Sequence, residues 1–264
     1  MEKQRNAGSQ TVERALEILV AIGASGLDGM TLAECSTRLS YSKATTHRIL
    51  RALEVHGFVE ADDDTGAYKL GMTNLRLGMD YLEHLELRRA ALRTLRTLAE
   101  EAQETVHLGV LDEARVVYIE KVESQHAIRM FSRVGHTMPA YSTGVGKAIL
   151  AFLPTDLVVH LLPASFEGFT ATTITTRDAL LVHLNETRAL GYAIDDVENE
   201  EGIRCVGAPV FDHTGSVIAA ISVAGPATRI TLERLEELGR VTQQAALAVS
   251  ERLGYRGLTV AAVT

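Results

Sequence analysis

A short basic segment near the N-terminus carries side chains suited to binding an anionic polymer. No acidic residue occurs from Thr37 to Leu53, and the segment 42–53 reads SKATTHRILRAL. As a helix, its apolar residues would fall roughly on one face: Ala44, Ile49, Leu50 and Leu53. The other face would carry Lys43, Thr45, Thr46, His47, Arg48 and Arg51. Such side chains reach phosphates and base edges, so the pattern favours contact with a nucleic acid duplex.

The residues around this segment predict the elements that would position it. Thr31 and Glu34 have the spacing of a capping box for a helix over 32–39, and Ser42 can cap the basic helix after a short turn. After Gly57, residues 58–61 and 67–70 read as two strands joined by a hairpin loop. Any amphipathic helix pair resembles a helix-turn-helix, but the hairpin directly after the second helix favours a winged helix-turn-helix.

Each basic residue has an expected contact in such a domain. The first turns of a recognition helix face the base edges, and Arg48 is the best candidate for reading guanine. Ser42, Arg51 and Lys69 are expected on phosphates, although a merely solvated position suits Arg51 equally well. The loop residues 62–64 are all Asp, which a phosphate backbone would repel. We therefore expect the wing tip to stay outside the minor groove, with Lys69 as the wing's strong backbone contact.

Composition sets the wider limits. The chain has 264 residues, enough for two domains, and a formal net charge of −8 from 26 basic and 34 acidic residues. The total charge argues against nucleic acid binding, but binding depends on the local patch. Cys35 and Cys205 are far apart in sequence and suggest neither a disulfide framework nor a metal site. No secretory signal or membrane-spanning apolar run is visible, so a cytoplasmic location is expected.

The remaining chain predicts a second, larger domain. Residues 73–87 and 88–104 read as helices, and the first has apolar residues on more than one side. Contact with a partner subunit and simple helix propensity explain that pattern equally well. Further on, strands are expected at 105–111, 115–121, 128–131, 205–211 and 217–223, and helices at 144–152, 155–162, 177–190 and 231–253, with Thr231 as the last cap. This order predicts an α+β domain with a mostly antiparallel sheet.

Several patches together resemble the IclR family of transcriptional regulators. They are residues 42–50, 68–71, 142–148, 191–196, 201–210 and 220–226, and the similarity covers roughly residues 9–255 in the family's order. The resemblance implies a winged helix-turn-helix at 9–71, a linker helix at 72–88 and a GAF-like effector-binding domain at 89–256. It also implies a homodimer or homotetramer that binds double-stranded, palindromic operator DNA, more often as a repressor, and responds to a small organic acid.

The glycine-rich segment 142–148 could be mistaken for a nucleotide-binding loop. That loop needs Gly five residues before the Gly-Lys pair and Ser or Thr after the Lys, where this chain has Tyr141 and Ala148. A glycine-rich turn that enters a helix still offers backbone N–H groups to an anion. In the family that this chain resembles, the amides matching Gly144 and Val145 hold the ligand's carboxylate.

The resemblance also implies the other effector contacts. They are Asp195, Cys205 and Ser222, with apolar walls at Met130, Met138 and Ile203. Asp195 and Ser222 can hydrogen-bond a hydroxyl or keto group, whereas Cys205 is equally well explained as an inert buried thiol. Some family members carry a second serine where this chain has Ala224. A ligand with an apolar portion is therefore expected, rather than the smallest keto acids.

The main alternative is an enzyme with a fused DNA-binding domain and Cys205 as nucleophile. The sequence identifies no adjacent base or oxyanion donors for that thiol, so an enzyme is not expected. The histidines are scattered without metal-ligand spacing, and His107 could line the pocket. We expect no cofactor and no metal ion.

Overall fold

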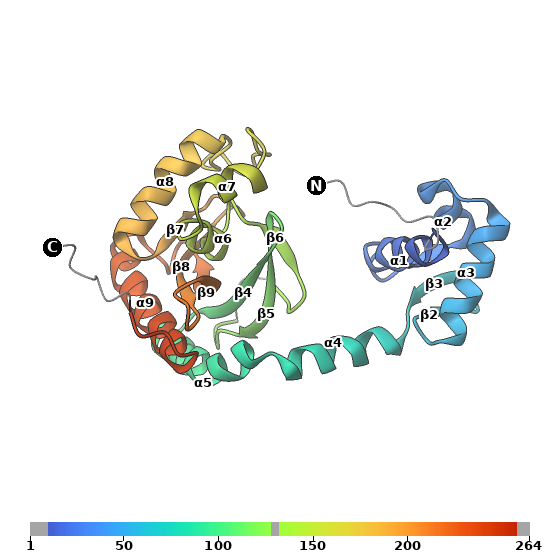
Figure 1. The fold of residues 1–264 in the computed structure, drawn as a ribbon, viewed down its shortest axis with the longest axis horizontal. Coiled ribbons are helices and arrows are strands. Elements are labelled where there is room, and N and C mark those ends of the chain that lie inside the picture. Colours follow the sequence, from blue (N-terminus) through green and yellow to red (C-terminus); the bar gives the residue numbers. More distant parts are fainter. Residues whose placement is uncertain (1–9, 128–131, 258–264) are drawn as a thin grey trace. The chain divides into compact units, whose positions relative to one another are not determined.

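The computed structural model describes residues 10–127 and 132–257 and divides into two compact units between His84 and Leu85 (Figure 1). This boundary assigns the helix α4 (Met72–His84) to the N-terminal unit and α5 (Glu86–Ala102) to the C-terminal unit. The predicted linker, residues 72–88, therefore contains the whole of α4 and the start of α5.

The N-terminal unit is a winged helix-turn-helix. Its elements are α1 (Gln10–Gly23), β1 (Met30–Thr31), α2 (Leu32–Leu39), α3 (Lys43–Val55), β2 (Val59–Ala61) and β3 (Ala67–Leu70). The predicted capping box is present: Glu34 N–H donates to the Thr31 hydroxyl, and the Glu34 carboxylate accepts from Thr31 N–H. Ser42 caps α3 by accepting from Thr45 N–H. The wing gains a third strand, β1, which pairs with β3 and was too short to predict.

One apolar core holds these helices and the wing together. It contains Ile18 of α1, Cys35 of α2, Leu50 of α3 and Val59 of β2, all at most 1% exposed. Burial of such side chains contributes roughly 1.5–3 kcal/mol each, so this core fixes the orientation of α3.

The C-terminal unit is built on a six-stranded sheet with the order β6-β5-β4-β9-β8-β7, in which all pairings are antiparallel. The strands are β4 (Thr105–Asp112), β5 (Arg115–Val122), β6 (Thr137–Pro139), β7 (Ala193–Asp196), β8 (Ile203–Phe211) and β9 (Val217–Pro226). The helices are α5, α6 (Gly144–Leu150), α7 (Thr155–Leu161), α8 (Arg177–Leu190) and α9 (Leu235–Arg252). The prediction of an α+β domain with a mostly antiparallel sheet is confirmed.

Helices cover both faces of this sheet. The helices α5 and α9 pack on each other and on β4 and β8, whereas α6 packs on β8 and β9 (Figure 1). The first turn of α6 lies directly against β8: a Cβ atom at Gly144 would be 2.8 Å from the Cys205 sulfur. The sheet face that carries Cys205 is therefore the face that α6 covers.

Some predicted elements differ from the structure. The strands β6 and β7 were missed because each has at most four residues. The closing helix begins with a 3-10 turn (Leu232–Arg234), and the Thr231 side chain makes no cap hydrogen bond, so the single capped helix predicted over 231–253 was wrong at its start. The predicted helix 144–152 ends at Leu150. The strand predicted at 128–131 lies outside the described residues. None of the described helices is long and apolar enough to cross a membrane.

Candidate functional site

Most of the predicted DNA-contacting side chains lie on the open face of α3. Lys43, His47, Arg48 and Arg51 are exposed, as is the cap residue Ser42, and Thr45 is partly exposed. Arg51 is already paired with Glu54 at 2.8 Å, although its side chain remains 63% exposed. Within the described residues, Lys43 and Arg48 on this face form no ion pair, so both charges are available to a ligand.

Thr46 corrects the predicted interface. It is 0% exposed, its hydroxyl donates to the Ser42 carbonyl, and the Ser36 hydroxyl of α2 donates to it at 3.1 Å. The buried face of α3 therefore differs from the predicted one, since Ala44 is exposed, whereas Thr46 is buried together with Ile49. Thr46 fastens α2 to α3 and cannot contact DNA in this conformation.

The wing loop is organised by its first aspartate. The Asp62 carboxylate accepts from Thr65 N–H and hydroxyl and forms an ion pair of 2.9 Å with Lys69. These contacts, led by the hydrogen bond from Lys69, hold the pKa of Asp62 well below its usual range. Lys69 is thus paired in the free protein, so the predicted phosphate contact requires it to share or leave this carboxylate.

Three of the predicted effector residues meet on neighbouring strands of the larger sheet. Asp195 on β7 lies opposite Cys205 on β8, and Ser222 on β9 lies opposite Gly207, two residues after Cys205. The pleat therefore places all three side chains on one face, where they are 4%, 7% and 1% exposed. Gly144 lies directly against this group, because a Cβ atom there would be 2.8 Å from the Cys205 sulfur.

A histidine extends this row of polar groups onto the next strand. His107 on β4 lies opposite Ser222, and its Nδ1 is 3.5 Å from the Ser222 hydroxyl. Its Nε2 is 2.7 Å from the Ser132 hydroxyl, and its ring stacks on Tyr118 with centroids 4.6 Å apart. Sequence reasoning raised His107 only weakly, because the register between β4 and β9 joins it to a residue more than a hundred positions away. It missed Tyr118 and Ser132, which no local pattern connects with His107.

The apolar residues predicted to line the site fall in two places. Ile203 packs with Cys205 and Ala224 beside the polar row, and Ala224 is 2% exposed. Met138, on β6, is half-buried and packs instead with the apolar cluster around α6. Met130 lies outside the described residues. The row is therefore polar at the Ser222 and His107 end and apolar at the Ile203 and Ala224 end.

Burial keeps this cluster close to electrically neutral. It raises the pKa of Asp195 to about 7, against the lowering effect of the Lys147 charge and of the Glu198 amide. It also raises the pKa of the Cys205 thiol to about 12 and, together with the Lys121 charge, lowers the pKa of His107 to about 3. At neutral pH the thiol is protonated, the imidazole is uncharged and the carboxyl is near its midpoint.

Comparison with known proteins identifies a family domain in each of the two units. The model of the IclR helix-turn-helix domain matches residues 11–63, and that of the bacterial transcriptional regulator IclR C-terminal domain matches residues 79–251. This chain belongs to the IclR family of transcriptional regulators. It is 38% identical to the HTH-type transcriptional regulator KdgR of Escherichia coli over 256 residues, 97% of this chain and 96% of that protein.

Two further relatives support the assignment. The HTH-type transcriptional repressor AllR of Klebsiella pneumoniae is 32% identical, with 97% of this chain and 94% of AllR covered. The crystal structure of the Thermotoga maritima IclR is similar with a TM-score of 0.74 at 35% identity, covering 93% of this chain and 99% of that one. The chain is therefore a DNA-binding transcriptional regulator with the family's helix-turn-helix and C-terminal domains.

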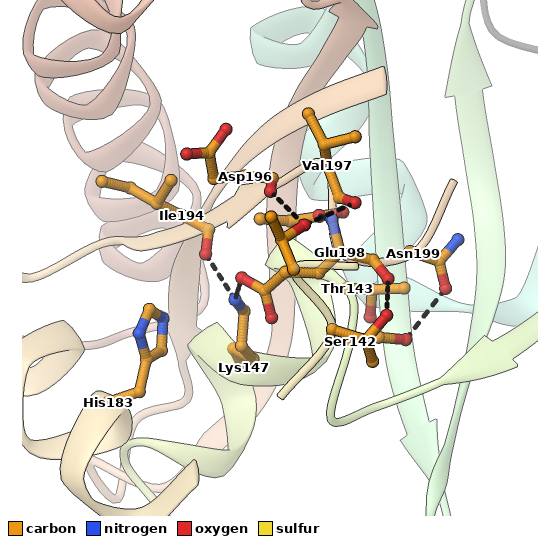
Figure 2. A network of polar contacts seen from close by, with 12 residues as sticks. Ser142, Thr143, Lys147, His183, Ile194, Asp196, Val197, Glu198 and Asn199 are labelled. Carbon is orange, nitrogen blue, oxygen red and sulfur yellow. Dashed lines mark hydrogen bonds and ion pairs between the residues drawn. The ribbon is translucent and has the colours of Figure 1, made fainter. Parts of the chain in front are cut away.

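Lys147, the lysine of the glycine-rich segment, is buried inside this IclR C-terminal domain. Its side chain is 0% exposed, and its ammonium group donates to the Ile194 carbonyl and forms an ion pair with Glu198 (Figure 2). A phosphate-binding lysine needs a free ammonium group directed at the ligand. The contacts of Lys147 therefore agree with the rejection of a nucleotide-binding loop.

The alternative of a cysteine nucleophile has little support in this IclR-family chain. A nucleophilic thiol needs a depressed pKa, whereas that of Cys205 is raised by burial and by the nearby Asp195. The neighbouring strands bring a hydroxyl and a carboxyl to the sulfur but no basic imidazole, since His107 is reached only through Ser222. Within the described residues, no group of three or more His, Cys, Asp or Glu could hold a metal ion.

Proposed function

We propose that the C-terminal unit binds a small organic acid at the row formed by Asp195, Cys205, Ser222 and His107. The observation that carries this proposal is the convergence of four buried polar side chains from four strands on one sheet face, beside the Gly144 turn. Burying a polar group is costly, so four of them on one sheet face favour a role in binding a ligand.

The chemistry of the row suggests the ligand class. Asp195, Ser222 and His107 can donate to or accept from hydroxyl and keto oxygens. Ile203 and Ala224 offer an apolar surface at the other end. The amides of Gly144 and Val145 are the proposed carboxylate contacts, as in the family. We infer an acid with at least one hydroxyl or keto group and a short apolar portion.

A melting-temperature screen tests this proposal. The full chain is heated with glyoxylate, pyruvate, gluconate or 4-hydroxybenzoate, each in excess. A ligand at about 100 times its Kd stabilises the native state by about 2.7 kcal/mol, which raises the Tm by several degrees. Hits are titrated by calorimetry against wild type and Ser222→Ala. Binding of only the two small keto acids would contradict the apolar portion, and hits with equal affinity for Ser222→Ala would place the site elsewhere.

We infer that the DNA-binding form is a homodimer on a palindromic operator. The helix α4 has no buried residue and exposes Met72, Leu75, Leu77, Met79 and Tyr81. The helix α1 exposes Val12, Leu16 and Val20. Apolar surface of this extent is typical of a subunit interface. Two identical α3 helices related by a twofold axis would read matching half-sites. A tetramer remains compatible with this arrangement.

Effector and operator would then act on one equilibrium. If the acid favours one arrangement of the two α3 helices and DNA favours another, each changes the other's affinity by the same factor. We propose repression as the sign of regulation, because a relative is named a repressor, and the cytoplasm as the location, where the operator lies. Selection of duplexes from a random library, repeated with and without the effector, would supply the operator and the coupling factor.

A further inference from the structure

The turn that follows Asp195 has a strained backbone. Val197 has φ of +61°, in the left-handed region that β-branched residues rarely adopt. A side chain from outside the turn contacts the backbone here: the Thr172 hydroxyl lies 2.9 Å from the carbonyl oxygen of Asp196 and 2.9 Å from that of Val197. The Thr173 hydroxyl donates to the Glu198 carbonyl at 2.6 Å. A conformation this unfavourable persists only where the surroundings enforce it.

Lys147 contacts this turn on both sides of Asp195. Its ammonium group donates to the carbonyl of Ile194, the residue before Asp195, and pairs with the carboxylate of Glu198, three residues after it (Figure 2). Glu198 in turn donates its backbone N–H to the Asp195 carboxyl at 2.8 Å. One ammonium group thus fixes the entry and the exit of the turn whose first side chain faces the proposed ligand.

The same lysine links the turn to the other side of the proposed site. Lys147 lies on α6, one helical turn after Gly144, which contacts Cys205. Near the start of α6, the Ser142 hydroxyl donates to the Asn199 side chain at 2.9 Å. The helix and the turn are therefore joined at two points, so a shift of Asp195 would be transmitted to α6.

Stability alone explains the Lys147 ion pair poorly. Both side chains are nearly inaccessible, at 0% and 6% exposure, and the second oxygen of Glu198 has no hydrogen-bond partner. Replacing such a buried pair by apolar residues is often neutral or stabilising. A role in placing Asp195 gives a reason for this costly arrangement.

We propose that Lys147 is a positioning residue for effector recognition, which holds the 195–199 turn so that Asp195 faces the ligand. This inference rests on the proposed effector site. The first test needs no effector: amide hydrogen exchange of the full chain, wild type against Lys147→Met. Without the ammonium group, the Glu198 amide is expected to exchange on the order of 10-fold faster or more, because the turn opens locally.

Arg229→Met is the matched control. Arg229 pairs with Glu104, which is 1% exposed, in the same domain but outside the 195–199 turn. The Arg229→Met variant is expected to lose a similar amount of stability, without faster amide exchange at 195–199.

Lys147→Met should also raise the pKa of Asp195 above about 7. The variant removes a neighbouring positive charge that lowers this pKa, while the Glu198 carboxylate remains. The other titratable neighbours, Tyr118 and Cys205, are uncharged and do not offset this change. Carbon-13 NMR of the carboxyl groups measures this shift, which Arg229→Met should not produce.

A double variant separates positioning from folding. Lys147→Met with Glu198→Gln removes both charges, so its Tm should recover toward wild type if the single variant unfolds. Exchange at 195–199 should stay fast, and affinity for an acid identified in the melting screen should fall at least about 10-fold. Wild-type exchange in a stable double variant would overturn the proposal. Fast exchange with unchanged effector affinity would show that Lys147 orders the turn while the effector binds elsewhere, which contradicts the proposed site instead.

Discussion

At the scale of single residues, burial decides what each polar group can do. Cys205 and Asp195 lie on one sheet face, and burial raises the pKa of both side chains, but the effect on their chemistry differs. The thiol becomes inert because its charged form is disfavoured, whereas the carboxyl is brought close to neutral pH, where small changes alter its charge.

Cys205 should react slowly with alkylating reagents. Its pKa of about 12 leaves very little thiolate at pH 8. We expect iodoacetamide to modify Cys205 at least about 100-fold more slowly in the native chain than in urea, since the thiolate is the reacting form. Peptide mass spectrometry distinguishes Cys205 from Cys35, which is also buried. Fast labelling with a titration below pH 8 would revive the nucleophile hypothesis.

Asp195→Asn should stabilise the protein near neutral pH. The folded-state pKa of about 7 lies above the ordinary value of 3.8, so the native state binds more protons than the unfolded state between those values. Stability therefore falls as pH rises from about 4 to 7, by on the order of 2–4 kcal/mol. Asn removes this loss. The Tm of the variant should exceed that of wild type at pH 7.5 and match it near pH 4, while effector binding weakens. Equal Tm differences at both pH values would contradict the raised pKa.

At the scale of elements, local signals were sufficient for the helices, whereas strand pairing was not predictable. The capping box at Thr31 predicted where α2 begins, and the observed helix Leu32–Leu39 matches the predicted range 32–39. In contrast, β1 and β7 have too few residues for a local pattern, and the neighbourhood of His107 depends on the register between distant strands. Thr46 was misplaced because the orientation of α3 depends on its packing against α2, which helical spacing alone does not define.

Thr46 and Arg48 should separate folding from DNA binding. Thr46→Val leaves the Ser36 hydroxyl without its acceptor, so we expect a loss of about 1 kcal/mol in unfolding free energy but unchanged operator affinity of the folded protein. Arg48→Ala should leave the Tm unchanged and weaken specific binding by about 1–3 kcal/mol. Denaturant unfolding and fluorescence anisotropy measure the two effects. Weaker DNA binding by fully folded Thr46→Val would show that Thr46 does contribute to the DNA interface.

At the scale of the whole molecule, charge and apolar surface are unevenly distributed. A chain of net charge −8 keeps a cationic surface on α3, and its α4 helix exposes five large apolar residues. The first distribution suits binding to DNA, and the second suits association with an identical chain.

Leu75→Glu should shift the protein toward monomers. Leu75 is 55% exposed on α4, so a charge there costs little in the monomer but would be buried in the proposed interface. Sedimentation velocity should show a smaller species at micromolar concentration, with an unchanged circular dichroism spectrum. Glu83→Lys, which also changes an exposed charge on α4, is the control. A Leu75→Glu protein that sediments like wild type would exclude α4 as the main interface.

The strand order of the larger unit has a consequence during synthesis on the ribosome. Its central pair joins β4 to β9, so the sheet cannot close until almost the whole chain has emerged. The helices and wing of residues 10–84 form a contiguous unit that can fold much earlier. Each nascent chain can therefore carry a folded helix-turn-helix unit for several seconds before the C-terminal domain closes, so a response to the proposed effector can start only when translation is nearly complete.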